Sequence, residues 1–242
     1  MAQGIPATSG TLYLVPNTLG ENDPAEVIPA QALARLRSLR YLIAENPKIA
    51  RQLLKRAGAT IPLQEIRIER LDEHTPASAL ADLLAPIAAG MDGGLVSDAG
   101  CPAVADPGAP LVRLAHERGI RVTPLVGPSS IMLALMASGL EGQCFAFHGY
   151  LPVEEAALVE KLRALEKESR RLRQTQIFIE TPYRNERMLG MMLRTLNEAT
   201  RLCTASELTL PGESIVARSI ANWRRQPPPS LKDRPTVFLF AA

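Results

Sequence analysis

The sequence predicts an α/β protein with two α/β domains, the first containing a mainly parallel sheet and the second a mixed sheet. In the first half, short apolar runs alternate with amphipathic stretches, which is the pattern of βαβ units. Near the end of the chain, short apolar runs follow one another directly, which favours a mixed sheet. The pattern changes at the glycine and proline of Val126-Gly127-Pro128, so we place the domains at residues 1–126 and 127–242.

The elements of the first half are expected in strict alternation. Short apolar runs predict strands, and apolar residues at helical spacing predict helices. Gly90 and Gly119 each follow a helical pattern and are expected to end it. The expected strands are residues 11–15, 41–44, 66–68, 94–96 and 120–125, and the expected helices are 30–39, 47–57, 77–89 and 109–118.

The second half begins with a helix that Ser129 is placed to cap. A proline-rich stretch at 224–235 is expected to be a connector before the last strand. The expected helices are 131–137, 154–173 and 185–196, and the expected strands are 144–148, 176–180, 201–206, 213–219 and 236–240.

Composition limits the class of protein. The net charge of +2 over 242 residues is too small to indicate a nucleic-acid partner by itself. The three cysteines, Cys101, Cys144 and Cys203, are few and unclustered, which favours reduced thiols and a cytoplasmic location. We expect no signal peptide, no membrane-spanning segment and a disordered stretch over the first ten residues.

The segment LVSDAGCPAVADPG, residues 95–108, carries the clearest functional signal. A buried strand breaks into a loop, and a helix pattern follows at once, which is the layout of a ligand-binding loop at the carboxyl end of a strand. Gly100 and Gly108 permit close backbone approach, and Asp98 and Asp106 offer hydrogen-bond acceptors. The alternative is an ordinary strand-to-helix connection, and Asp106 fits it well because Asp-Pro-Gly is also a turn signature.

The sequence lacks the motifs of several other classes of enzyme and binding site. The chain contains no P-loop, HExxH, CxxC pair, GxSxG elbow or GxGxxG fingerprint. Its histidines, His74, His116 and His148, have no metal-ligand spacing, so we expect no metal site. His148 lies in an apolar strand and is expected to be structural, and Cys101 has no neighbouring base and is expected to be a small packing residue.

The loop sequence DAGCPAVADPG closely resembles the D-A-G-T-P-x-x-x-D-P-G signature of the tetrapyrrole methylase-like superfamily of S-adenosylmethionine-dependent methyltransferases. Within it, the chain is most similar to the bacterial small-subunit rRNA 2′-O-ribose methyltransferases. The resemblance runs in order along nearly the whole chain. The other similar segments are GTLYLVPNTLG (10–20), LVGPSS (125–130), FHGYLP (147–152), FIETPYR (178–184) and SELTLPGESI (206–215).

The resemblance implies a homodimeric methyltransferase that binds S-adenosylmethionine in a cleft between the two domains. The loop around Asp98 and the segment from Gly127 would hold this cofactor, and the start of the last strand would line its adenine side. The implied cofactor-binding residues are Pro16, Ser97, Asp98, Ala99, Gly100, Cys101, Val104, Ala105, Asp106, Pro128, Ser129, Ser130, Tyr150, Thr181, Pro182, Pro235 and Thr236.

The rRNA methyltransferases also suggest the methyl acceptor, although this sequence differs from theirs at two places. The resemblance implies a ribose 2′-hydroxyl of small-subunit ribosomal RNA. However, the branch's acidic-D-T-R run reads AENPKIAR here, and Leu210 stands where its E-L-T-K run has lysine. The alternatives are a methyltransferase for a tetrapyrrole or other small molecule, and a cofactor-binding protein without catalysis.

Glu180 and Glu207 are the candidate catalytic residues, because each lies at the end of an expected strand and a base can assist deprotonation of a hydroxyl. Asp98 is a third candidate base, and the sequence does not choose among the three. The alternative for both glutamates is turn chemistry at the end of a strand.

Two groups of cations are candidates for binding RNA. Lys48, Arg51 and Lys55 fall on one face of an expected helix and would form a phosphate-binding stripe, or else the solvated side of an amphipathic helix. Arg184 and Arg187 lie beside a motif and are stronger candidates for contact with the substrate.

Overall fold

The computed structural model describes residues 9–242, so most of the expected disordered N-terminal stretch lies outside the described residues. The chain divides into two compact units, the first extending to Ser129 and the second running from Ser130 to Ala242. The division falls shortly after the boundary expected at residue 126. Each unit has its own sheet and its own hydrophobic core.

The first unit contains a five-stranded sheet in the order β3-β2-β4-β1-β5, and every neighbouring pair is parallel. The expected mainly parallel sheet is therefore confirmed. The strands are β1 (Thr11–Val15), β2 (Tyr41–Ala44), β3 (Arg67–Arg70), β4 (Gly93–Val96) and β5 (Arg121–Pro124).

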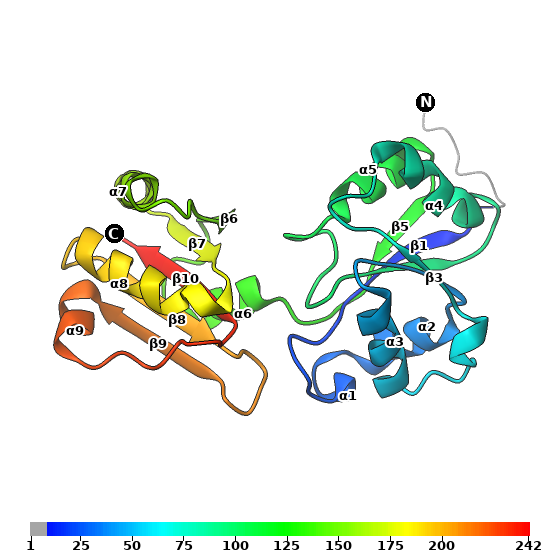
Figure 1. Cartoon of the computed structure of the whole chain (residues 1–242), viewed down its shortest axis with the longest axis horizontal. Coiled ribbons are helices and arrows are strands. Elements are labelled where there is room, and N and C mark those ends of the chain that lie inside the picture. The colour runs from blue at the N-terminus through cyan, green and yellow to red at the C-terminus, as the bar shows by residue number, and fades with distance from the viewer. Residues whose placement is uncertain (1–8) are drawn as a thin grey trace. The chain divides into compact units, whose positions relative to one another are not determined.

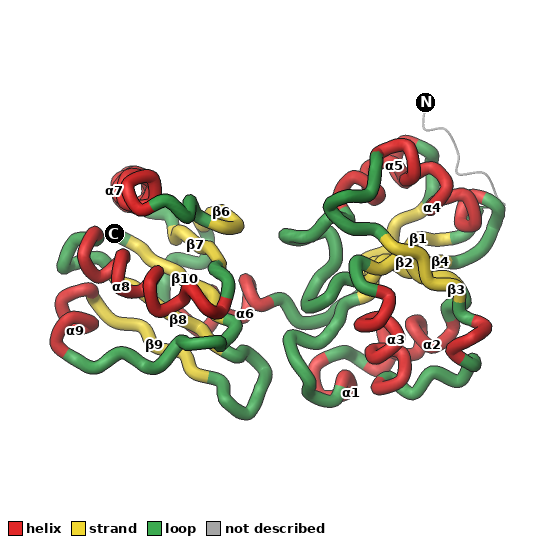
Figure 2. The backbone as a smooth tube through the Cα atoms, in the orientation of Figure 1, coloured by secondary structure: helices red, strands yellow, loops and turns green. Residues whose placement is uncertain are grey.

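Helices cover both faces of this sheet (Figure 2). On one face, α2 (Ala30–Ser38) and α3 (Pro47–Arg56) share a core with Val15 and Leu42. On the other face, α4 (Leu80–Ala88) and α5 (Ala109–Glu117) pack on Leu12 and Leu95. The chain leaves β1 toward the first face and leaves the adjacent β4 toward the second. The carboxyl ends of β1 and β4 are therefore the topological switch point, where open α/β sheets bind ligands.

The second unit contains a mixed five-stranded sheet in the order β6-β7-β10-β8-β9, which confirms the expected sheet type. Only β6 and β7 pair in parallel, and the remaining neighbours are antiparallel. The strands are β6 (Phe145–Tyr150), β7 (Thr175–Ile179), β8 (Arg201–Ser206), β9 (Ser214–Ser219) and β10 (Thr236–Ala241).

Helices pack on this sheet (Figure 1). The core contains apolar residues of α7 (Glu155–Leu172), α8 (Asn185–Thr195) and α9 (Ile220–Arg225), together with Phe178, Phe238 and Phe240. The helix α6 (Ser130–Ser138) contacts β8, β9 and β10.

The structure differs from the sequence expectations mainly in short elements. The expected helix at 77–89 is a 3-10 turn, Ala77–Ala79, followed by α4. The helix α1 (Pro24–Val27) and the 3-10 turns Leu63–Glu65 and Pro182–Arg184 are too short to show a periodic pattern. The helix α9 overlaps the start of the expected connector, and its apolar residues Ile220 and Trp223 are spaced by a single turn.

Candidate functional site

The first group of candidate residues lies at the switch point of the first unit, where Asn17 joins two loops. Asn17 follows β1 and is 1% exposed. Its side-chain amide donates to the carbonyls of Ser97 (3.2 Å) and Asp98 (3.0 Å), and its backbone N–H donates to the carbonyl of Gly100 (2.9 Å). The loop after β1 therefore holds the loop after β4 in place.

Two glycines allow the loops to approach closely. A Cβ atom on Gly127 would lie 2.2 Å from the Cβ of Pro16, so only glycine fits there. Gly100 has φ +68°, and its backbone lies against Leu19 and Pro128. The Cys101 thiol donates to the Pro128 carbonyl at 3.4 Å, and burial raises its pKa. Cys101 thus makes a packing contact between two loops, and the loops after β1, β4 and β5 form one assembly.

Asp106 shapes the loop from inside. Its Oδ1 accepts hydrogen bonds from the backbone N–H groups of Ala103 (2.7 Å) and Gly108 (2.8 Å). In this turn, Ala103 and Ala105 adopt positive φ values of 66° and 58°. This is the turn role considered for Asp106 from the sequence. It leaves Val104 exposed at the tip of the loop.

Asp98 lines an acidic pocket at the same edge of the sheet. The pocket has a volume of about 440 Å³ and is also lined by Glu45, Asn46, Pro47, Arg70, Asp72, Glu73 and His74. Burial raises the pKa of Asp98, which accepts a hydrogen bond from the backbone of Asn46. Burial and the nearby charges of Asp98 and Asp106 raise the pKa of Glu45. The site therefore has an uncompensated negative charge.

The second group of candidate residues lies at one edge of the sheet in the second unit. Thr236, at the start of β10, pairs with Ser206 at the end of β8, and Val237 pairs with Ile179 at the end of β7. Tyr150, at the end of β6, pairs with the same Ile179. The structure thus places the ends of four strands together, and with them Tyr150, Glu180, Thr181, Pro182, Glu207, Pro235 and Thr236.

Glu180 is buried, and one of its oxygens is fully engaged in local contacts. Its Oε1 accepts from the backbone N–H of Thr181 (2.6 Å), the Thr181 hydroxyl (3.1 Å) and the Arg184 guanidinium (2.7 Å). The contacts match the turn chemistry considered as the alternative for this residue. They also occupy Arg184, which was a candidate for contact with the substrate.

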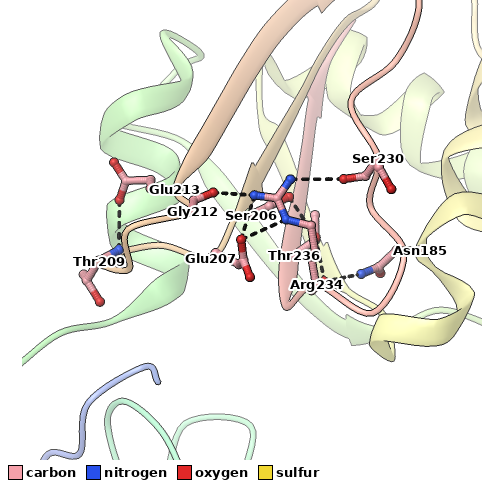
Figure 3. Close-up of polar contacts among 9 residues, drawn as sticks. All are labelled: Asn185, Ser206, Glu207, Thr209, Gly212, Glu213, Ser230, Arg234 and Thr236. Carbon is pink, nitrogen blue, oxygen red and sulfur yellow. Dashed lines mark hydrogen bonds and ion pairs between the residues drawn. The ribbon is translucent and has the colours of Figure 1, made fainter. Parts of the chain in front are cut away.

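Glu207 is held by a residue that the sequence did not single out, Arg234 (Figure 3). Two nitrogens of the Arg234 guanidinium contact Glu207 Oε2, at 2.9 Å and 2.8 Å. The same guanidinium donates to the carbonyls of Gly212 and Ser230. Among the described residues, Glu207 Oε1 has no hydrogen-bond partner, so Glu207 retains an oxygen for a ligand.

The carbonyl of Arg234 is fixed as well. It accepts from the side-chain amide of Asn185 at 2.7 Å and from the Thr236 hydroxyl at 2.9 Å, and that hydroxyl also lies 2.9 Å from Ser206 Oγ. Asn185 is fully buried. These contacts orient Pro235 and Thr236 at the edge of the sheet.

Sequence reasoning missed Asn17, Asn185 and Arg234. Asn17 and Asn185 had a detectable signal, because an asparagine after a strand or at the start of a helix often bonds to the backbone. Arg234 had no such signal, because its partner Glu207 lies 27 residues away in the sequence and no local pattern links the two. Of the other candidates, Arg187 donates to the Val153 carbonyl at 3.1 Å, and His148 contacts Gln176 at 2.6 Å, which supports its structural role.

Two solved structures of methyltransferases have similar folds. The methyltransferase CobJ superposes with a TM-score of 0.63 at 18% identity, covering 96% of this chain and 94% of that one. The cobalt precorrin-4 methyltransferase CbiF superposes with a TM-score of 0.60 at 16% identity over the same shares of the two chains. The fold is therefore the tetrapyrrole methylase-like α/β fold.

Sequence comparison identifies the family. Ribosomal RNA small subunit methyltransferase I of Escherichia coli O157:H7 is 35% identical over 208 residues, which are 86% of this chain and 68% of the relative. The protein of the same name from Pseudomonas aeruginosa is 33% identical over 214 residues, or 88% of this chain and 72% of the relative. The chain belongs to this family. No family model matches it.

Within residues 9–242, no helix has the length and apolar character that crossing a membrane requires.

Proposed function

We propose that this protein transfers a methyl group from S-adenosylmethionine to a ribose 2′-hydroxyl of small-subunit ribosomal RNA. The observation that carries the proposal is the 33–35% identity to the two relatives named for methylation of this RNA, over more than four fifths of the chain. The glycine-rich loop at the switch point supports the cofactor assignment, because this edge of an open α/β sheet is where ligands bind.

The residues at the switch point fit this cofactor. S-adenosylmethionine carries a positive sulfonium and an ammonium group, and its ribose has hydroxyl donors. Asp98 and Glu45 supply carboxylate acceptors in a pocket where burial raises both pKa values and the charge of Asp98 further raises that of Glu45. A cationic ligand would relieve that repulsion. We propose that the loop from Ser97 to Asp106 binds it, together with Pro16, Pro128, Ser129 and Ser130.

The second unit contributes residues toward both the cofactor and the acceptor. We propose that Tyr150, Thr181, Pro182, Pro235 and Thr236 contact the cofactor. S-adenosylmethionine supplies an activated methyl group, so the protein's task is to align the acceptor oxygen with that carbon. Among the described residues, Glu180 and Glu207 each keep one carboxylate oxygen without a hydrogen-bond partner. For accepting the proton of a hydroxyl, Glu207 is better placed, because its side chain is 29% exposed and that of Glu180 only 4%.

The decisive experiment offers the protein two classes of acceptor with methyl-labelled S-adenosylmethionine. One arm contains small ribosomal subunits from cells lacking this methyltransferase, and the other contains a panel of porphyrinogens. We expect label in ribosomal RNA, at a nucleotide that resists alkaline cleavage on its 3′ side because its 2′-oxygen is methylated. Label found only in a porphyrinoid would overturn the assignment of RNA as the acceptor. If the protein bound the cofactor but methylated none of the acceptors, it would be a cofactor-binding protein without catalysis.

The cofactor site has its own test. Replacing Asp98 by alanine should weaken S-adenosylmethionine binding at least about tenfold, as expected for the loss of a charged hydrogen-bonding partner. Calorimetry measures the affinity directly. Unchanged affinity would remove Asp98 from the site.

We also propose that the protein acts as a homodimer in the cytoplasm, where its ribosomal substrate is found. Light scattering at micromolar concentration should give twice the mass of the 26.2 kDa chain. A monomer mass would overturn the proposed assembly.

A further inference from the structure

The exposed face of α3 carries a row of cations, and the first of them is unfavourably placed on the helix. Lys48, Arg51 and Lys55 are all exposed and lie three and four residues apart, so they form one stripe, which we call the α3 stripe. The opposite face buries Ala50, Leu53 and Leu54 in the core. The helix therefore turns the stripe away from the sheet.

Helix electrostatics disfavour the start of the α3 stripe, whereas Lys55 lies in the last turn, where the helix dipole favours a cation. Lys48 lies in the first turn, where the helix dipole favours a negative charge, and this turn has no acidic residue. Arg51 and Lys55 are four residues apart and repel each other. In the part of the chain that the structure describes, none of the three makes an ion pair. The helix α7 differs from α3 in this respect, because its cations alternate with acidic residues: Glu155, Glu160, Glu166 and Glu168.

The α3 stripe is rigidly connected to the switch point. Its helix begins at Asn46, which lines the pocket beside Asp98 and whose backbone bonds to that carboxylate. At the other end of α3, Arg56 donates to the carbonyls of Gly20 (3.2 Å) and Asn22 (3.0 Å) and to the hydroxyl of Thr18 (3.2 Å). Both ends of α3 thus hold loops that follow β1 or β4.

We propose that the α3 stripe binds the phosphate backbone of the RNA substrate beside the methyl-transfer site. The inference rests on the proposed function, since it concerns the same substrate. Among the described residues the three cations make no ion pair, and they share one helix face over two turns, so they can contact neighbouring phosphates of one strand. Phosphate contact would supply the negative charge that the first turn of α3 lacks. The acidic pocket repels phosphates and so keeps the backbone on the helix face.

The test compares two variants that lose the same charge. One is Lys48→Gln/Arg51→Gln/Lys55→Gln, and the control is Lys161→Gln/Lys167→Gln/Arg171→Gln on exposed positions of α7. Binding to unmodified small-subunit ribosomal RNA, transcribed in vitro, is measured from low to high salt. Circular dichroism and S-adenosylmethionine affinity report whether the fold and the cofactor site are intact.

We expect the α3 variant to bind RNA about tenfold or more weakly, with a salt slope reduced by about 0.7–0.9 for each lost phosphate contact. The control should keep the wild-type slope, and Arg51→Lys should do so too because it keeps the charge. Equal effects of the two triple variants would mean that only net charge matters and would overturn the inference. If the wild type methylates RNA and the α3 variant binds RNA as tightly as the wild type does, the inference about the α3 stripe is overturned and the proposed function stands. If the wild type neither binds nor methylates RNA, the proposed function is overturned together with the inference.

Discussion

Arg234 shows how much of the site can depend on one side chain. It joins the Glu207 carboxylate, the β8–β9 connection at Gly212 and the proline-rich connector at Ser230. Glu207 itself has a positive φ of 49°, and a Cβ on Gly212 would collide with its Oε2. The geometry around Glu207 therefore depends on both a guanidinium and a glycine.

Replacing Arg234 by methionine should destabilise the protein by about 1–3 kcal/mol, because several hydrogen bonds to a charged group are lost and Glu207 is left without its partner. Urea unfolding measures the change. Arg225→Met is the matched control, since Arg225 is exposed at the end of α9, and it should change little. Equal effects of the two substitutions would show that the network around Arg234 does not stabilise the fold.

Glu45 illustrates the opposite case, a residue that the fold accommodates at a cost. Burial and nearby carboxylates raise the pKa of Glu45, so the folded state binds its proton more tightly than the unfolded state does. The free energy of unfolding therefore falls as the pH rises through the raised pKa.

Glu45→Gln should accordingly raise the melting temperature at pH 7 and have little effect near about pH 3.5, where the carboxyl is protonated in both states. Thermal unfolding at the two pH values measures this difference. Glu26→Gln, at an exposed position on α1, is the control. A lower melting temperature at pH 7 would mean that Glu45 has a stabilising partner.

At the scale of elements, the loops at the carboxyl ends of β1, β4 and β5 act as one unit. Asn17 connects the first two by hydrogen bonds, and Gly127 lets the third approach Pro16. The proline ring cannot move aside as a flexible side chain would.

Gly127→Ala should therefore destabilise the protein by about 1–3 kcal/mol through overpacking. It should also weaken S-adenosylmethionine binding, because Pro16 and Pro128 are displaced. Chemical unfolding and calorimetry measure the two effects. Gly142→Ala is the control, as nothing lies within 4 Å of its added Cβ. If the Gly127→Ala variant were as stable as the wild type, the loops would have moved apart at no cost in free energy.

The elements themselves were largely predictable. The continuous apolar run Tyr41–Ala44 and the amphipathic pattern of α3 form the expected strand and helix. Short elements such as α1 escaped prediction because four residues contain about one turn and show no period.

At the scale of the whole molecule, the hydrophobic cores are separate. Every residue of the core around Phe178 and Phe238 comes from the second unit, and the two cores on either side of β4 come from the first. Phe178 and Phe238 are fully buried and stack with ring centroids 5.6 Å apart.

Phe178→Ala should remove this stack and cost about 3–5 kcal/mol. Because the cavity forms in one core, hydrogen exchange should accelerate between Ser130 and Ala242 and stay unchanged up to Ser129. Exchange measured by mass spectrometry separates the two regions. Faster exchange in both would mean that the units unfold together.

The sequence by itself determined the α/β fold class, the type of each sheet and the position of the glycine-rich loop. These features depend on residues that are close together in the chain, so periodicity, glycine and proline reveal them, whereas the class of enzyme was implied by the resemblance to a known family. Only the tertiary structure decided which side chains meet. The pairing of Glu207 with Arg234 and the contact of Asn17 with the loop after β4 both depend on strand order and register. Such contacts join distant segments, and no local pattern encodes them.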